Sequence, residues 1–263
     1  MNKLSPEMPE LQSMNITADN ITKLKSLFPE AFNEDSVDFE VLKQLLGENV
    51  DDKEERYGLN WHGKRQARQL ALTPSRGTLR PCKDESVDWD NTKNLMIEGD
   101  NLEVLKLLQK SYAGKVKLIY IDPPYNTGNE SWVYNDNVNS PQMKKWLGKV
   151  VGKESEDLTR HDKWLCMMYP RLKLLHKLLA KDGVIFISIN FKHEHSHLKL
   201  ICNEIFGETN YIGELTWEST TQPINSGSAK FGLQQKVEPI MFFAKNKSKI
   251  ERFILKEIDT GLK

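Results

Sequence analysis

Apolar segments that alternate with amphipathic segments constrain the fold of this chain most. The runs VKLIYI (116–121) and VIFISI (184–189) are apolar at almost every position. A strand that is apolar on both faces needs cover on both faces, which is typical of a mostly parallel sheet. Between the two runs, WLCMMYPRLKLLHKLLAKDG (164–183) has the apolar stripe of a helix that ends at Asp-Gly.

Further segments continue the same alternation of strand and helix. We expect strands over 94–99, 211–217 and 239–245, and helices over 101–112 and 195–208. The sequence therefore predicts an α/β fold built on part of a doubly wound, mostly parallel, Rossmann-like sheet.

Charge and periodicity divide the chain into three predicted regions. Residues 1–60 carry 13 acids against six bases, and the segments 17–31 and 38–46 have helical spacing. These residues predict a small acidic helical module at the N-terminus. Residues 61–92 have little periodicity and predict a basic linker, and residues 93–263 contain the predicted sheet.

Composition favours a cytoplasmic protein without a membrane partner. The three cysteines, Cys82, Cys166 and Cys202, are odd in number and far apart, which is typical of reduced buried thiols. No apolar run approaches the roughly 18 residues of a membrane span, and the first residues lack the apolar core of a signal peptide.

The basic cluster at residues 61–82 is a candidate nucleic-acid contact. The formal net charge of the chain is zero, which argues against a general nucleic-acid coat. This segment, however, has no acid and carries five bases beside Trp61: Lys64, Arg65, Arg68, Arg76 and Arg80. Such a cluster is usually a solvated face, and contact with phosphates is the alternative.

The turn that follows the second strand, in LIYIDPPYNTG (118–128), is the strongest candidate for a site. In an open parallel sheet, ligands bind beyond the carboxyl ends of the strands, where Asp122 stands. Pro123 and Pro124 stiffen the turn and lack N–H groups, so the turn offers backbone acceptors. With the carboxylate of Asp122 and the ring of Tyr125, it suits a planar ring that bears an exocyclic amino group.

The same turn has a simpler interpretation. Two prolines are common in turns, and an acid is a frequent turn former. Two features favour an active site instead. Gly99-Asp100 ends the neighbouring predicted strand, and a long polar stretch, 126–160, follows the turn.

Several strings together resemble a known family. DPPY after an apolar strand resembles motif IV of amino-group DNA methyltransferases. Four longer strings resemble the adenine-N6 methyltransferase (Mod) subunits of type III restriction-modification systems: WHGKRQARQLALTPS (61–75), LMIEGDNLEVLKLLQKSYAGKVKLIYIDPPYNTG (95–128), MMYPRLKLLHKLLAKDGVIFISI (167–189) and ICNEIFGETNYIGELTW (201–217). The resemblance extends from about residue 15 onward and identifies 93–263 as the N-terminal part of a DNA methylase N-4/N-6 domain.

This resemblance implies a mechanism and a set of site residues. The family transfers a methyl group from S-adenosylmethionine to an adenine flipped out of duplex DNA. Asp122 and the Pro123 carbonyl would hold the amino group, Pro124 would complete the rigid turn, and Tyr125 would stack on the base. Asp100 matches the acidic position that contacts the adenine moiety of the cofactor. A metal site is not expected.

The resemblance also implies partners and a lid. The implied partners are double-stranded DNA, a second Mod subunit and a Res helicase-nuclease subunit. Arg65 and Arg68 would contact DNA, and so would Trp132 and Tyr134 in a lid formed by the polar stretch. A mobile surface loop is the plainer interpretation of that stretch.

The family's glycine-rich cofactor loop, of the form FxGxG, has no convincing match. The candidates INSGSAKFG (224–232) and YAGK (112–115) do not follow an apolar strand with the right spacing. The resemblance therefore covers the front half of a Mod subunit, and we expect this polypeptide alone not to methylate DNA.

Two functions of other classes remain as alternatives. HEHSH (193–197) fits the HExxH pattern of zinc-dependent hydrolases, in which two histidines lie one helical turn apart. It stands at the start of a predicted helix, however, and no third ligand follows at helical spacing. The other alternative is a non-catalytic interaction fragment that docks into Mod dimers.

Overall fold

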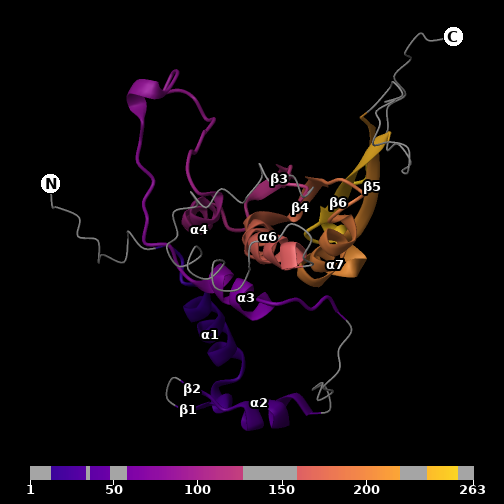
Figure 1. Ribbon diagram of the computed structural model, residues 1–263. Helices are drawn as coiled ribbons and strands as arrows, with labels where there is room; N and C mark the ends of the chain where they lie inside the picture. The colour runs from indigo at the N-terminus through magenta and orange to yellow at the C-terminus, as the bar shows by residue number, and fades with distance from the viewer. Residues whose placement is uncertain (1–12, 34–35, 48–57, 127–158, 220–235, 254–263) are drawn as a thin grey trace. The chain divides into compact units, whose positions relative to one another are not determined.

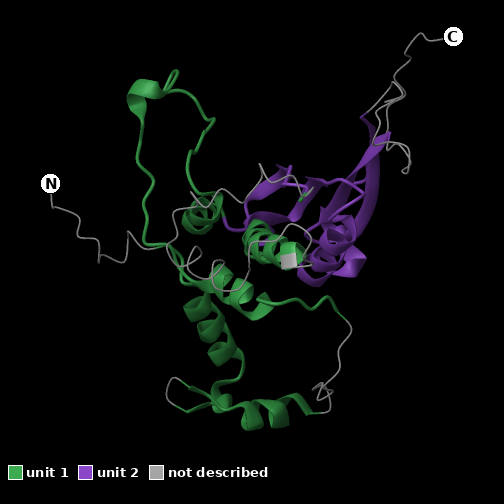
Figure 2. Ribbon diagram, in the orientation of Figure 1, with its two compact units in different colours: residues 1–112, 126–175 green, residues 113–125, 176–263 purple. Residues whose placement is uncertain are grey.

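The computed structural model describes residues 13–33, 36–47, 58–126, 159–219 and 236–253 (Figure 1). The chain forms two compact units (Figure 2). Unit 1 contains residues 1–112 and 126–175, and unit 2 contains residues 113–125 and 176–263. In the described residues, no helix has the length and the apolar character needed to cross a membrane.

Unit 1 is mainly helical. A short antiparallel pair, β1 (Phe32–Asn33) and β2 (Ser36–Val37), follows the first helix. The helices are α1 (Ile16–Leu27), α2 (Phe39–Leu46), α3 (Lys64–Leu72), α4 (Asn101–Tyr112) and α6 (Thr159–Leu178), with 3₁₀ turns at η2 (Pro29–Ala31) and η4 (Lys83–Glu85). The last three residues of α6 belong to unit 2.

Side-chain caps explain where the first two helices begin. The side chain of Asn15 accepts a hydrogen bond from the Ala18 N–H at 3.0 Å. Asp38 accepts from two backbone N–H groups of α2, at 2.9 and 3.1 Å. All three bonds satisfy backbone donors that a helix start leaves unpaired. The two helices predicted at the N-terminus are therefore present, with α1 ending just before Pro29.

The apolar core of unit 1 joins four helices. Ile16 of α1, Leu102 of α4 and Leu174 of α6 are at most 4% exposed. Leu70, Leu72 and Leu105 pack against this group. Apolar residues of four helices meet in this one cluster, and their packing holds α1, α3, α4 and α6 together.

Helix α3 was not predicted, because residues 61–92 read as a linker with little periodicity. Its buried face carries Ala67 and Ala71, which are small and give a weak apolar pattern. The preceding Trp61 is buried, and its Nε1–H donates to the Cys166 Sγ of α6 at 3.2 Å. This part of the predicted linker is thus packed into unit 1.

The strand predicted over residues 94–99 is absent. Leu95 is 68% exposed and Met96 is 96% exposed, and the segment has no regular secondary structure. An extended segment becomes a strand only when a neighbour accepts and donates its backbone hydrogen bonds. The prediction was wrong because, in the part of the chain that the structure describes, this segment has no strand beside it.

Unit 2 is a four-stranded sheet with one long helix, α7 (His195–Phe206). The strands run in the order β3 (Val116–Ile121), β4 (Leu179–Ser188), β6 (Val237–Ala244) and β5 (Tyr211–Glu218). The α/β class is confirmed. The sheet is mixed and not mostly parallel, since only β3 and β4 are parallel, whereas β6 is antiparallel to both β4 and β5. Short 3₁₀ turns precede β5 (η6, Glu208–Asn210) and follow β6 (η8, Lys247–Lys249).

The two faces of this sheet differ in cover. On one face, Ile185, Ile187 and Phe243 are fully buried, and the Phe243 ring lies 5.5 Å from Phe206 of α7. The opposite face carries apolar side chains that are more than half exposed: Leu118, Tyr120, Leu215 and Trp217. We call the latter the open face of the sheet.

The join between α6 and β4 also differs from the prediction. The helix ends at Leu178 and the strand begins at Leu179, so the helix starts and ends five residues earlier than the predicted 164–183. Residues 180–183 lie within a register shift, since Val116 pairs with Leu179 and Leu118 pairs with Val184. Gly183 fits there because a Cβ would lie 2.7 Å from the Val116 carbonyl oxygen.

Candidate active site

The Asp-Pro-Pro-Tyr turn directly follows β3 in unit 2. Asp122 is exposed, Pro123 is buried, and Pro124 and Tyr125 are half-buried. The turn thus begins with an accessible carboxylate and ends with a partly exposed ring. All four predicted catalytic residues lie in this short corner at the carboxyl end of the strand.

A pocket of about 380 Å³ lies beside this corner. This volume falls in the usual range for small-molecule sites. Each strand of the sheet contributes to its wall. The lining residues are Tyr120, Asp122, Tyr125, Ser188, Trp217, Glu238, Pro239 and Ile240.

Strand register explains how distant segments meet in this wall. Tyr120 lies near the carboxyl end of β3, two residues before Asp122, and both residues line the pocket. On the neighbouring strands, Ser188 is paired with Ile240, and Trp217 is paired with Glu238. The pocket is therefore a row of side chains that crosses all four strands.

Hydrogen bonds fix two of the aromatic rings. The hydroxyl groups of Tyr120 and Ser188 lie 2.5 Å apart, which ties the Tyr120 ring to the end of β4. Burial and a hydrogen bond to Asp122 raise the pKa of Tyr125 well above its usual value. The Tyr125 phenol therefore stays protonated at neutral pH and donates to the Asp122 carboxylate.

The chemistry of the pocket suits a planar ligand with N–H donors. Two carboxylates, Asp122 and Glu238, accept hydrogen bonds, and three rings, Tyr120, Tyr125 and Trp217, offer stacking surfaces. Of these five residues, the sequence motif identified only Asp122 and Tyr125. The others stand on strands, and only alternation with a known strand pairing would have found them.

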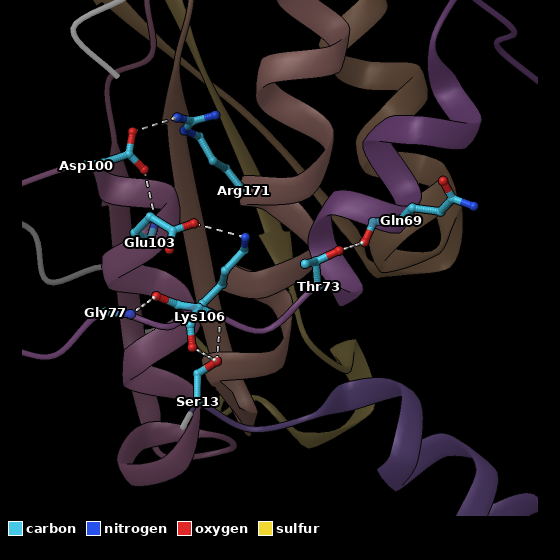
Figure 3. A network of polar contacts seen from close by, with 9 residues as sticks. Ser13, Gln69, Thr73, Gly77, Asp100, Glu103, Lys106 and Arg171 are labelled. Atoms are coloured by element: carbon cyan, nitrogen blue, oxygen red, sulfur yellow. Dashed lines mark hydrogen bonds and ion pairs between the residues drawn. The ribbon is translucent and has the colours of Figure 1, made fainter. Parts of the chain in front are cut away.

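Asp100, the predicted cofactor residue, lies in unit 1 and directly precedes α4. Its Oδ1 accepts the Glu103 N–H at 2.9 Å, so Asp100 caps the helix. Its Oδ2 lies 4.0 Å from an Nη2 of Arg171 (Figure 3). This oxygen is buried and, among the described residues, has no hydrogen-bond donor.

The predicted DNA contacts divide into two groups. Arg65 and Arg68 are both exposed on α3, whereas Ala67 and Ala71 of the same helix are buried. Trp132 and Tyr134 lie outside the described residues.

The HEHSH segment does not have the helical geometry of an HExxH site. Helix α7 begins at His195, so His193 precedes the helix and His197 lies within it. Glu194 is fully buried, and its Oε2 lies 2.8 Å from the His197 Nδ1. A zinc peptidase needs both histidines on one turn of a continuous helix and a glutamate that is open to water.

The Asp-Pro-Pro-Tyr turn lies within the part of the chain that matches a known protein family. The profile of the DNA methylase family matches residues 116–260, which include β3, the Asp-Pro-Pro-Tyr turn and the strands of the pocket. The chain belongs to the DNA methylase family.

Relatives of this methylase chain include Mod subunits of type III restriction-modification enzymes. It is 37% identical over 254 residues to the EcoP15I Mod subunit of Escherichia coli, covering 92% of this chain and 38% of that protein. It is also 37% identical over 254 residues to the EcoPI Mod subunit of Escherichia phage P1, covering 90% of this chain and 38% of the relative. The type II methyltransferase M.KpnI of Klebsiella pneumoniae is 38% identical over 126 residues, which are 48% of this chain and 27% of M.KpnI. The methylase chain thus spans about two fifths of the length of the Mod relatives.

Proposed function

We propose that this methylase chain holds the target base for an adenine-N6 DNA methyltransferase, as part of a type III Mod subunit. The pocket at the end of β3 supports the proposal most directly. It places the Asp122 carboxylate and the Tyr125 ring together in a volume of about 380 Å³. An adenine flipped out of duplex DNA presents a flat ring and an amino group with two N–H donors.

The turn acts on the amino group through its acceptors. Asp122 accepts one N–H and the Pro123 carbonyl accepts the other, while Tyr125 stacks on the ring. Two accepted bonds draw the amino nitrogen towards a pyramidal geometry and direct its lone pair away from the turn. Methyl transfer would form the new N–C bond as the S–C bond of the sulfonium breaks, leaving a neutral thioether. One amino proton would then leave the nitrogen, and the Asp122 carboxylate would receive it.

S-adenosylmethionine is the proposed cofactor, and when bound it supplies an electrophilic methyl group on a sulfonium. The residues present fit part of such a molecule. Asp100 offers a buried carboxylate oxygen that has no donor among the described residues, and an amino or hydroxyl group of the cofactor would satisfy it.

The proposed partners follow from the same assignment. Double-stranded DNA is the substrate, and a second Mod subunit and a Res helicase-nuclease complete the system. The exposed side of α3, with Arg65 and Arg68, is suited to phosphate contacts, because guanidinium groups bind phosphate oxygens in a fixed fork geometry.

The test uses a chimeric Mod subunit. Residues 1–263 of this chain replace the matching part of the EcoP15I Mod subunit, and labelled methyl transfer to DNA is measured. Mass spectrometry of the digested DNA identifies the methylated base. We expect N6-methyladenine, and we expect Asp122→Ala to lower the rate on the order of a hundredfold or more.

A matched control distinguishes the site from the strand around it. Thr216→Ala removes an exposed side chain beside Trp217, on the opposite side of β5, and should leave the rate unchanged. Methylation that survives Asp122→Ala undiminished would refute the proposed role of the turn. N4-methylcytosine as the product would refute the choice of adenine.

A further inference from the structure

Arg171 is a buried arginine that the proposed chemistry leaves unexplained. The residue is only 8% exposed, in the middle of α6. A buried guanidinium loses its hydration, which is costly unless partners in the protein replace the water. The protein groups that replace water around the Arg171 guanidinium therefore indicate the role of this residue.

The contacts of the guanidinium include Asn101, Met167 and Asp100, of which Figure 3 shows the contact with Asp100. Its Nε–H donates to the Asn101 Oδ1 at 2.6 Å, and its Nη1 donates to the Met167 carbonyl at 2.7 Å. Its Nη2 lies 4.0 Å from the Asp100 Oδ2. The two short bonds go to neutral oxygens, and the carboxylate is held at ion-pair distance without a hydrogen bond.

This division of contacts has a consequence for Asp100. Arginine usually binds a carboxylate through two parallel N–H···O bonds, which occupy an acceptor site on each carboxylate oxygen. Here the guanidinium lies at ion-pair distance from the carboxylate, and among the described residues no donor uses the lone pairs of Oδ2. The second oxygen, Oδ1, is already fixed by the Glu103 N–H at the start of α4. The carboxylate is thus oriented through Oδ1, and among the described residues its Oδ2 has no donor, so it can accept one from a ligand.

We propose that Arg171 is a positioning residue for the cofactor site: it orients Asp100 so that Oδ2 accepts an N–H from the adenine amino group of the cofactor. This inference rests on the proposed function, which assigns Asp100 to the cofactor. Asn101 shares the task, since its bond to Nε fixes the guanidinium relative to the first residue of α4.

Ligand affinity of the full 263-residue chain gives the first test. Binding of S-adenosylhomocysteine and of S-inosylhomocysteine, which lacks the amino group, is measured by calorimetry. We expect Arg171→Met to weaken binding of the first ligand about tenfold, equivalent to about 1.4 kcal/mol, and to leave the second unchanged. Arg171→Lys keeps the positive charge but loses the planar guanidinium group. This variant should therefore lose less affinity for S-adenosylhomocysteine than Arg171→Met does.

Coupling to Asp100 separates positioning from a general loss of stability. In an Asp100→Asn background, Arg171→Met should cause little further loss of affinity, because the carboxylate it orients is gone. Arg80→Met removes an exposed arginine of the same unit and should change neither affinity. If Asp100→Asn weakens binding and Arg171→Met does not, the positioning role is wrong while the proposed function stands.

Exchange of one backbone amide tests the orientation without any ligand. The Glu103 N–H is protected by the Asp100 Oδ1, so hydrogen exchange at this amide reports the position of the carboxylate. Faster exchange in Arg171→Met, but not in Arg80→Met, supports the positioning role even where the wild-type chain does not bind S-adenosylhomocysteine. Unchanged exchange at Glu103 would overturn it.

Discussion

Tyr125 and Asp122 are linked before any base enters the pocket. The phenol donates to the carboxylate, and burial together with this bond keeps the pKa of Tyr125 far above its usual value. An incoming amino group must therefore share the carboxylate with an O–H donor that is already in place. The ring of Tyr125 and its hydroxyl group consequently have separate roles, which substitutions can divide.

Tyr125→Phe and Tyr125→Ala separate these roles in the chimeric methyltransferase. Phenylalanine keeps the stacking surface and frees the Asp122 carboxylate, so we expect the methylation rate to stay near that of the wild type. Alanine removes the ring, and base stacking is worth about 1–3 kcal/mol, so the rate should fall at subsaturating DNA. Equal losses in the two variants would show that the hydroxyl, and not the ring, carries the function of this residue.

Tyr211 provides a pH-dependent contribution to stability. Burial and a hydrogen bond to Glu214 raise its pKa to about 12 from the ordinary 10.0. Since the folded state holds this proton more tightly than the unfolded state, the contribution is complete below about pH 10. It is lost as the pH rises from there towards 12.

The measurement compares urea unfolding of the wild type and Tyr211→Phe as a function of pH. Phenylalanine keeps the ring that lies 5.1 Å from Phe243 but has no proton to release. The difference in free energy of unfolding between the two proteins should therefore stay constant near neutral pH. Above about pH 10, the wild type should lose stability relative to Tyr211→Phe. A difference that is independent of pH in this range would contradict the raised pKa.

At the scale of elements, Gly183 sets the register between β3 and β4. A Cβ at this position would meet the Val116 carbonyl oxygen at 2.7 Å, closer than real Cβ atoms approach backbone. We expect Gly183→Ala to force the strands apart and to lower the free energy of unfolding by about 1–3 kcal/mol, measured by urea denaturation. The loss should exceed that of the control Gly114→Ala.

Gly114 is a useful control because its reason for being glycine is different. It has a φ of +71°, and a Cβ there would meet no atom within 4 Å. Alanine at this position costs only the strain of a left-handed backbone, which is roughly 1–2 kcal/mol. If Gly183→Ala were as stable as the wild type, the register shift would not depend on the missing side chain.

Sequence patterns predicted the elements that carry their own signals. Asn15 and Asp38 cap helices where the periodicity begins, and the apolar runs of β3 and β4 form the parallel pair. Helix α3 was missed because alanines form its buried face, and the strand over 94–99 was wrong because pairing depends on a neighbour. Local patterns specify elements, whereas strand pairing depends on contacts between distant segments.

The same distinction applies to the pocket. The carboxylate and ring of the Asp-Pro-Pro-Tyr turn are adjacent in sequence, so a motif could reveal them. Glu238 and Trp217 reach the pocket through the register of β5 against β6, and Ser188 through its bond to Tyr120. No spacing in the sequence encodes these relations, because each depends on how distant segments pair.

At the scale of the whole molecule, the open face of the sheet and the zero net charge both favour self-association of the chain. Leu118 and Leu215 on this face are 59% and 54% exposed, and the chain has equal numbers of acidic and basic residues. Exposed apolar patches promote association, and a net charge near zero provides little repulsion to oppose it. The purified chain should therefore self-associate at neutral pH.

Leu118→Lys combined with Leu215→Lys tests this expectation. Both changes place charge on the open face without opening the buried face, so the free energy of unfolding should change by no more than about 0.5 kcal/mol per site. Light scattering should show less association, and a dye that binds apolar surface should fluoresce less. The control Leu198→Lys puts a charge at a fully buried position of α7 and should unfold unit 2. If the double variant unfolded as the control does, the open face would be part of a packed core, and its exposure would not explain association.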